Sequence, residues 1–303
     1  MKLRCRDLAI DVSRPLVMGV LNATPDSFSD GGEFDGVAAQ VRRGLELIDE
    51  GADVIDIGGQ SAITGVPEIS VDEEIGRLVP VVEGVRAESD CMISVDTYRP
   101  AVADAALRAG ADIVNDISGV LDPELADIVL EHRAGFVVMH TRWKPKTRED
   151  ARLLYRERGV LDDVVSFLRE RVDLLLTRGL DVEQLIIDPG PDFAKTAAQT
   201  VDVLRGLDAI VAFERPVLLA LSRKDFIGVI TRRPPKERLA GTLAAVAATT
   251  RIAPSSILRV HDVRETREFL AVLDVLDGRQ EIAADAGLDK ELRWQARVAP
   301  EST

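Results

Sequence analysis

The run Leu16-Val-Met-Gly-Val-Leu-Asn22 decides the fold, because it is apolar throughout and ends on a polar residue. Seven further runs have the same character: Asp53–Gly59, Met92–Thr97, Ile113–Ser118, Phe136–His140, Leu185–Pro189, Val217–Ser222 and Ile257–Asp262. A strand that is buried on both faces of a parallel sheet has such a continuous apolar sequence. The chain therefore predicts eight parallel strands.

Amphipathic stretches with helix start and stop signals separate these strands. Ser70-Val-Asp-Glu73 has capping-box spacing, and Asp122-Pro123 offers an N-cap followed by proline at the first helical position. Gly51, Gly110 and Gly179 follow helical stretches, where a C′ glycine belongs. Strand–helix alternation predicts right-handed crossovers, and eight repeats favour a closed barrel over an open doubly wound sheet.

The predicted architecture is α/β, a single-domain (β/α)8 TIM barrel. We expect the barrel over residues 16–278, a short N-terminal hairpin over residues 1–15 that plugs its bottom, and a polar tail over residues 279–303. The charged loop 141–158 is long enough to act as a flap over the site.

Composition excludes several classes of partner and location. A net charge of −14 argues against binding nucleic acid or anionic membranes, since both reward clustered Lys and Arg. The two cysteines, Cys5 and Cys91, form no metal-binding or disulfide pattern. Residues 1–15 lack the apolar stretch of a signal peptide, and no run is long enough to span a membrane. We therefore expect a cytoplasmic protein.

Polar side chains gather at the C-terminal ends of the predicted strands. They are Asn22, Asp56, Asp96, Asn115, Asp116, His140, Asp188, Ser222, Arg223, Lys224, Arg259, His261 and Asp262. Buried charges are costly unless they are paired, and the C-terminal face of a barrel is where its sites form. Any one of them, such as Asp56, can equally be a structural pair in the barrel core, but the whole ring predicts a ligand pocket.

The chemistry of this ring predicts a ligand with two different ends. Asp96, Asn115 and Asp188 offer acceptors to a flat heterocycle with adjacent N–H donors. Lys224 and Arg259, with His261, come from the last two strands, where barrels often bind phosphate.

Several motifs carry a family resemblance. They are Met18-Gly-Val-Leu-Asn-Ala-Thr-Pro-Asp-Ser-Phe-Ser-Asp-Gly-Gly32, Asp53–Gly59, Ser94–Thr97, Asn115–Ser118, Asp188-Pro-Gly190, Ser222-Arg-Lys224, Arg238–Leu243 and Arg259–Val263. In this order they resemble the dihydropteroate synthase family, from about residue 8 to about residue 275. That family joins 4-aminobenzoate to the diphosphate ester of hydroxymethyl-dihydropterin in folate biosynthesis, with departure of diphosphate.

The resemblance implies residue roles, a metal and an assembly. By motif, Asp96, Asn115, Asp188 and Lys224 would bind the pterin, Arg259 and His261 the diphosphate, and Asn22 would face Mg²⁺. In an active enzyme, Lys224 and Asp96 would be the catalytic residues. The family forms homodimers through late helices, and the Ala-rich run Leu239–Thr250 suits such close packing.

The sequence departs from the family pattern on the substrate face. The second loop carries Gln60, Ala62, Ile63 and Thr64 where the family has Glu, Thr, Arg and Pro, and the other departures are Asp192, Ala220 and Asp225. Losing one charge-assisted contact costs roughly 1.5–3 kcal/mol. The departures therefore predict a divergent, inactive homologue, which keeps the pterin pocket but has weak or absent dihydropteroate synthase activity.

Three alternatives stay open at this point. The first is an active synthase that completes its site with Arg142, Lys144 or Lys146 of the long loop. The second is a regulatory protein that binds a pterin-like ligand without chemistry. The third, a methyltetrahydrofolate methyltransferase, is disfavoured by the first motif and by the lack of a corrinoid module.

Overall fold

The computed structural model describes residues 1–23, 33–60, 66–147, 150–155, 157 and 159–293. These residues form two compact units, Met1–Arg267 and Glu268–Thr303. The first unit contains the barrel. The second contains most of the last helix and a short 3-10 turn, Lys290–Leu292, and within it Arg279 pairs with Asp274 at 2.7 Å.

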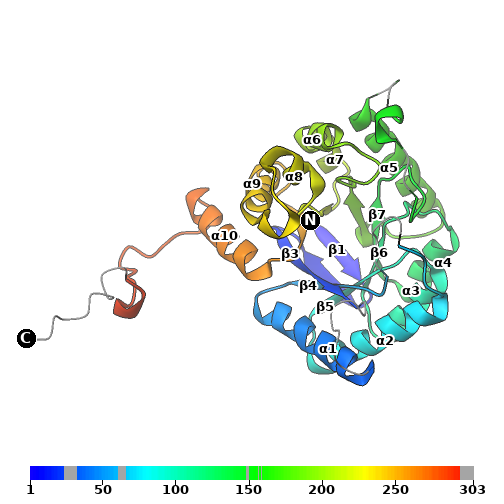
Figure 1. Ribbon diagram of the computed structural model, residues 1–303, viewed down its shortest axis with the longest axis horizontal. Coiled ribbons are helices and arrows are strands. Elements are labelled where there is room, and N and C mark those ends of the chain that lie inside the picture. The colour runs from blue at the N-terminus through cyan, green and yellow to red at the C-terminus, as the bar shows by residue number, and fades with distance from the viewer. Residues whose placement is uncertain (24–32, 61–65, 148–149, 156, 158, 294–303) are drawn as a thin grey trace, which may run out of the picture. The chain divides into compact units, whose positions relative to one another are not determined.

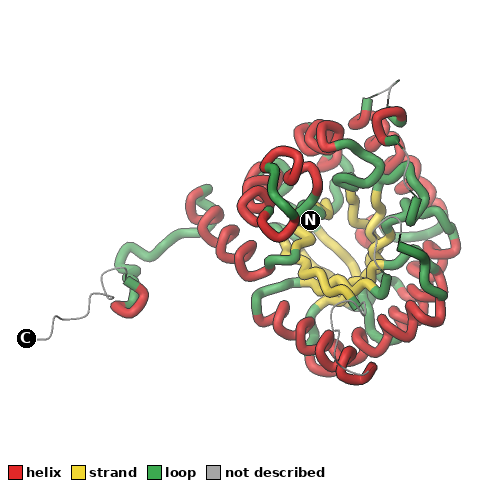
Figure 2. Tube along the Cα trace, in the orientation of Figure 1, coloured by secondary structure: helices red, strands yellow, loops and turns green. Residues whose placement is uncertain are grey.

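Eight strands close the barrel, as predicted from the apolar runs (Figures 1 and 2). They are β3 (Leu16–Asn22), β4 (Val54–Gly58), β5 (Met92–Asp96), β6 (Ile113–Asp116), β7 (Gly135–Met139), β8 (Leu185–Asp188), β9 (Val217–Leu219) and β10 (Ser256–Val260). Every strand pairs in parallel with its neighbours, and β10 closes the ring on β3 with Leu258 opposite Val17. The predicted (β/α)8 fold is confirmed.

Helices follow the strands along the chain, and those of the first unit surround the barrel (Figure 2). They are α1 (Glu33–Asp49), α2 (Val71–Glu88), α3 (Pro100–Arg108), α4 (Glu124–His132), α5 (Val160–Thr177), α6 (Ala197–Arg205), α7 (Asp208–Val211), α8 (Asp225–Thr231), α9 (Leu239–Thr250) and α10 (Val263–Leu276). Short 3-10 turns cover Ala151–Leu153, Val182–Gln184 and Pro235–Glu237. None of the helices in the described ranges is long and apolar enough to cross a membrane.

The helix boundaries follow the local signals in the sequence. Ser70 caps α2 by accepting the Glu73 N–H at 3.1 Å, as its spacing predicts. Helix α4 begins one residue later than predicted, because the Asp122 carboxylate accepts the Glu124 N–H at 3.0 Å and leaves Pro123 in the cap. Gly51, Gly110 and Gly179 have φ of 103°, 114° and 100°, as expected at C′ positions.

The predicted N-terminal hairpin is present as β1 (Lys2–Cys5) and β2 (Leu8–Asp11), which pair antiparallel. Its buried residues Leu3 and Cys5 belong to one apolar cluster with Met18, Val54 and other strand residues of the barrel interior. Figure 1 shows β1 lying across the ring of strands. A Cβ on Gly135 would meet Cys5 Sγ at 2.7 Å, so the glycine permits this close contact.

Candidate active site

Arg259 of β10 joins two carboxylates from distant parts of the chain. Its Nε donates to Asp56 Oδ2 at 2.6 Å, and its Nη2 donates to Asp96 Oδ2 at 2.9 Å. The three residues lie on β10, β4 and β5, so the closed barrel brings them together, with Asp96 at the end of its strand and Asp56 in the middle of β4. One edge of a guanidinium presents two parallel N–H donors, Nε and Nη2, and here each of them binds a different carboxylate.

Asp56 is fully buried and accepts two further hydrogen bonds. Ser94 Oγ donates to its Oδ1 at 2.6 Å, and Asn115 Nδ2 donates to its Oδ2 at 3.2 Å. The contact with Asp56 fixes the orientation of the Asn115 amide. Asn115 Oδ1 is buried, and no donor among the described residues binds it. A buried acceptor without a donor costs free energy, so this oxygen is suited to an N–H of a ligand.

Two carboxyl groups of the ring have pKa values that are raised toward 7. Burial raises the pKa of Asp96 to about 7, although the Arg259 charge opposes the shift. Burial likewise raises the pKa of Asp188 to about 6, and the Gly190 N–H, which donates to its Oδ1 at 2.7 Å, opposes it. Carboxyl groups with such pKa values can accept or donate hydrogen bonds close to pH 7.

Lys224 stands beside this set at the start of α8. Its Nζ lies 4.3 Å from the centroid of the Phe193 ring, which is within cation–π range. Burial lowers the Lys224 pKa, while the nearby Asp192 and Asp188 carboxylates raise it. The ammonium therefore depends on neighbouring negative charge.

His261 and Asn22 lie at the edges of the ring. His261 Nδ1 is 2.9 Å from Ser222 Oγ, and burial lowers the His261 pKa to about 4, so its ring is neutral at pH 7. Arg223, which follows Ser222 in the chain, is paired with Asp262: its Nη2 donates to Asp262 Oδ1 at 2.5 Å. Asn22 is exposed at the end of β3, opposite Gly58 of β4.

Lys195, which no sequence pattern had singled out, is a buried cation with several hydrogen-bond partners near the site. Its buried Nζ lies 2.8 Å from His140 Nδ1 and donates to the carbonyls of Gly190 at 2.9 Å and Phe193 at 3.0 Å. Burial lowers its pKa to about 7. Since Nδ1 accepts from Lys195, His140 carries its proton on Nε2, 3.0 Å from Asp163 Oδ2.

His140 is therefore a structural residue in this arrangement. Burial, with the Lys195 charge, lowers its pKa to about 3, so the ring is neutral. The only signal in the sequence for Lys195 was its position two residues after Phe193. Its partner His140 is 55 residues away, which no local pattern reveals.

The departures from the family pattern have different surroundings. Gln60 Oε1 accepts the Ile69 N–H at 3.0 Å and its Nε2 donates to Tyr98 at 3.2 Å. Asp225 is exposed and accepts from Arg238 Nη1 at 2.9 Å. Ala220 is buried just after β9, and Asp192 makes hydrogen bonds to two elements. Ala62, Ile63 and Thr64 lie outside the described residues.

The three basic residues of the long loop after β7, Arg142, Lys144 and Lys146, lie in different surroundings. Arg142 pairs with Asp163 of α5, through Nη2 at 2.7 Å. Lys146 lines a small hollow that also contains Asp96 and Gln60. The Lys144 carbonyl accepts the Thr147 N–H at 3.1 Å and the Thr147 Oγ1 hydroxyl at 2.7 Å. Of the three candidates, Lys146 is the one that lines a hollow with Asp96.

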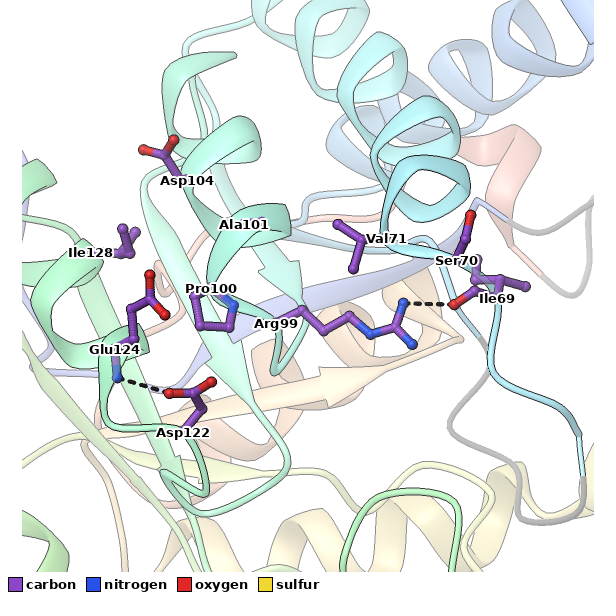
Figure 3. A pocket seen from close by; sticks show the side chains of 10 residues that line it. All are labelled: Ile69, Ser70, Val71, Arg99, Pro100, Ala101, Asp104, Asp122, Glu124 and Ile128. Carbon is purple, nitrogen blue, oxygen red and sulfur yellow. Dashed lines mark hydrogen bonds between the residues drawn. The ribbon is translucent and has the colours of Figure 1, made fainter.

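A larger cavity, of about 680 Å³, lies elsewhere on the rim. Figure 3 shows it between the start of α2, the start of α3 and the start of α4, with Arg99 donating to the Ile69 carbonyl at 2.8 Å. Asp104, Asp122 and Glu124 line it, and no residue of the ring does. We therefore place the candidate site at the strand ends.

Comparison with known proteins agrees with this geometry. The model of the pterin binding enzyme family matches residues 18–261. A dihydropteroate synthase of Synechocystis is 42% identical over 265 residues, which cover 87% of this chain and 90% of the relative.

Solved structures give the same result. The Xanthomonas albilineans dihydropteroate synthase with 4-aminobenzoic acid has a TM-score of 0.81 and 38% identity, over 93% of this chain and 99% of that one. The same enzyme in complex with 7,8-dihydropteroate has a TM-score of 0.79 and 39% identity, over 91% and 99% of the two chains.

These findings contradict the expectation of a homologue with weak or absent activity. The relatives that cover nearly the whole chain are dihydropteroate synthases, and nothing in the comparisons singles out an inactive branch. The expectation counted each departure as a lost contact, whereas Gln60, Asp192 and Asp225 have hydrogen-bond partners of their own. The chain belongs to the pterin binding enzyme family, among the dihydropteroate synthases.

Proposed function

We propose that this protein is an active dihydropteroate synthase, which condenses hydroxymethyl-dihydropterin diphosphate with 4-aminobenzoate. The observation that carries the proposal is the unpartnered Asn115 Oδ1, buried beside the Asp56–Arg259–Asp96 network. The related Xanthomonas albilineans enzyme, described with 4-aminobenzoic acid and with 7,8-dihydropteroate, supports it.

In this proposal the pterin ring lies against the ends of β5, β6 and β8. Asn115 Oδ1 accepts one ring N–H, and Asp96 and Asp188 exchange hydrogen bonds with the remaining amidine-like edge. Their raised pKa values support this role, because either carboxyl group can take the protonation state that the ring requires. Lys224 donates to the acceptor side of the ring.

The reaction breaks the bond between the pterin methylene carbon and the diphosphate oxygen. Diphosphate leaves with the bonding electrons, the aniline nitrogen forms a bond to the methylene carbon, and that nitrogen then loses one proton. We assign Arg259 and His261 to the diphosphate. Arg259 is permanently charged, while His261 is neutral and offers one N–H.

Mg²⁺ fits this site only as a partner of the substrate. Within the described residues, no group of three or more His, Cys, Asp or Glu side chains is arranged to hold a metal, and Asn22 offers a single exposed amide oxygen. Mg²⁺ is commonly bound by one or two protein oxygens together with substrate phosphates and water. When bound, it would neutralise charge on the departing diphosphate.

Turnover is the direct test of the proposal. Purified protein is mixed with the pterin diphosphate, 4-aminobenzoate and Mg²⁺, and dihydropteroate is followed by chromatography, with Asn115→Ala as the impaired variant. We expect steady turnover by the wild type and a kcat/KM lower by roughly a hundredfold in the variant. Calorimetric binding of the pterin diphosphate with no turnover would instead identify a pterin-binding protein without chemistry.

We also propose a homodimer. Val229 and Ile230 of α8 are exposed, and α9 exposes Ala240, Ala244 and Ala248 at helical spacing, which suits packing against a second copy. Sedimentation at two protein concentrations tests this, and a monomer throughout would exclude it. Cytoplasmic location stays a prediction from the sequence.

A further inference from the structure

Asp192 connects two elements on either side of Lys224. It lies in the loop between β8 and α6, and its φ of +64° is in the left-handed region, which Asp tolerates better than most residues. Thr200 Oγ1 of α6 donates to its Oδ1 at 3.0 Å, and the Phe226 N–H of α8 donates to its Oδ2 at 3.2 Å. Both carboxylate oxygens are therefore engaged.

The contact with Phe226 is a helix cap supplied from a distant part of the chain. Helix α8 begins at Asp225 with Lys224 as its N-cap residue, and the Lys224 side chain makes no capping hydrogen bond. Asp192 instead accepts an N–H of the first turn, which otherwise lacks a partner within the helix. It thereby ties the first turn of α8, two residues after Lys224, to the loop between β8 and α6.

Phe193, the residue next to Asp192, contacts the ammonium end of the Lys224 side chain. The Phe193 ring lies 4.3 Å below Lys224 Nζ. Two consecutive loop residues thus act on Lys224, Asp192 through the backbone of α8 and Phe193 through the ammonium.

The charges around Lys224 give Asp192 a second effect. Burial lowers the Lys224 pKa, and among the opposing charges Asp192 is the strongest. The other groups that act on Lys224 are Asp188 and Asp225, which raise its pKa, and Arg259 and Lys195, whose positive charge disfavours a further ammonium. His261 also faces Lys224, but its ring is neutral at pH 7. Removal of the Asp192 charge therefore moves the Lys224 pKa down.

We infer that Asp192 is a positioning residue for Lys224, fixing the start of α8 and keeping the ammonium charged where the pterin binds. The resemblance had placed Asp192 among the losses, since the family has glycine there. The inference deepens the proposed function and rests on it for the role of Lys224, although the effect of Asp192 on Lys224 is independent of catalysis.

The experiment compares three variants with the wild type. Asp192→Asn keeps the size and tolerates the left-handed backbone but removes the charge, whereas Asp192→Gly removes both the charge and the cap. Asp202→Asn, an exposed carboxylate on α6, is the matched control. Thermal unfolding identifies any variant that fails to fold.

The first readout is the titration of Lys224 itself. The chain has seven lysines, so ¹³C-lysine labelling resolves their Cε signals, and Lys224→Arg assigns the relevant one. We expect the Lys224 pKa to fall in Asp192→Asn and to stay unchanged in Asp202→Asn. An unchanged Lys224 titration in folded Asp192→Asn overturns the inference.

The second readout is the pH profile of kcat/KM for the pterin diphosphate. Its alkaline limb moves to lower pH in Asp192→Asn, and Asp192→Gly loses roughly tenfold in kcat/KM at neutral pH. An alkaline limb that stays in place while the Lys224 signal shifts overturns the link between the two. If the wild type shows no turnover yet the Lys224 pKa responds, the proposed function fails and the positioning effect stands.

Discussion

Asp56 carries three hydrogen bonds in a fully buried position. Arg259, Asn115 and Ser94 all donate to it, so its charge is compensated by one cation and two neutral donors. A buried ion pair contributes little net stability, but removing one partner leaves the other charge uncompensated. Asp56 therefore matters to the fold as well as to the orientation of Asn115.

We predict that Asp56→Ala lowers the free energy of unfolding by about 3–5 kcal/mol, because Arg259 loses one of its two carboxylates inside the barrel. Urea denaturation measures this difference. Asp208→Ala, at an exposed position of α7, is the control and is expected to change stability by less than about 0.5 kcal/mol. A loss below about 1 kcal/mol for Asp56→Ala would mean that water reaches Arg259.

Asp96 gives a prediction in which stability and function separate. Its pKa is raised from 3.8 to about 7 by burial, so the folded state holds a proton that the unfolded state releases as pH rises from about 4 to about 7. Wild-type stability therefore falls across this window, by at most about 1.4 kcal/mol for each pH unit. Asp96→Asn removes this contribution.

As pH rises from 4 to 7, we expect the free energy of unfolding of Asp96→Asn to increase relative to that of the wild type. Its kcat/KM for the pterin diphosphate should fall by roughly a hundredfold, because a carboxyl contact to the ring is lost. Denaturation curves at several pH values and one kinetic series decide the matter. Parallel pH–stability curves for the two proteins would show that the Asp96 pKa is the same in the folded and unfolded states, and would contradict the prediction.

Lys146 is the candidate cation for the aminobenzoate side, since it lines the same hollow as Asp96 and Gln60. We predict that Lys146→Met raises the KM for 4-aminobenzoate by roughly tenfold and leaves that for the pterin diphosphate within twofold. The matched control is Lys144→Met in the same loop. Equal effects of both substitutions would point to loop folding instead of ligand contact.

At the scale of elements, the loop between β8 and α6 is the most constrained segment near the site. Gly190 has a φ of +64°, and a Cβ on it would come within 2.1 Å of the His140 carbonyl oxygen. Asp192 and Ala194 have φ of 64° and 51°, so alternate residues of the loop are left-handed. Such conformations persist only where the surroundings hold them, and Lys195 binds the Gly190 and Phe193 carbonyls.

We predict that Lys195→Met lowers the free energy of unfolding by about 2–4 kcal/mol, because two carbonyls and the His140 ring lose a buried donor. It should also reduce kcat/KM, since the loop carries Phe193 and directly follows Asp188, the last residue of β8. The exposed Lys236 provides Lys236→Met as the control, to be compared by chemical denaturation. Native-like stability of Lys195→Met would show that backbone turns alone hold the loop.

The sequence predicted this architecture well because burial on both faces leaves a continuous apolar run. Strand β3 has the predicted bounds, and β9 is shortened most, ending at Leu219 where the expected strand continued to Ser222. Strand ends likewise located Asp96, Asn115 and Arg259. Their pairing was not predictable, since Arg259 contacts Asp56 across 203 residues, and neither were the partners of Asp192.

At the scale of the whole molecule, the hairpin closes one end of the barrel. Leu3 and Cys5 are fully buried against the strand interior, and Arg215 Nη2 donates to the Lys2 carbonyl of β1. The polar ring lies at the opposite end, where the strands finish, so the proposed ligands would enter from that side. We expect the hairpin to contribute stability without a direct role in the site.

Two leucines of the hairpin provide a matched test. Leu3 is fully buried, whereas Leu8 is 43% exposed. We predict that Leu3→Ala costs about 2–5 kcal/mol of unfolding free energy and Leu8→Ala less than about 0.5 kcal/mol, with unchanged kinetic constants in both folded variants. Denaturation followed by intrinsic fluorescence measures both. Comparable small losses would indicate that the hairpin detaches readily from the barrel.

The position of Cys5 under the barrel has a practical consequence. Burial raises its thiol pKa to about 12, and that of the partly buried Cys91 to about 11, so alkylating reagents find almost no thiolate in the native protein. Alkylation of Cys5 by such a reagent then requires the hairpin to detach from the barrel. The rate of that capture, followed by mass spectrometry of the N-terminal peptide, reports how often the closed end opens, with no added label.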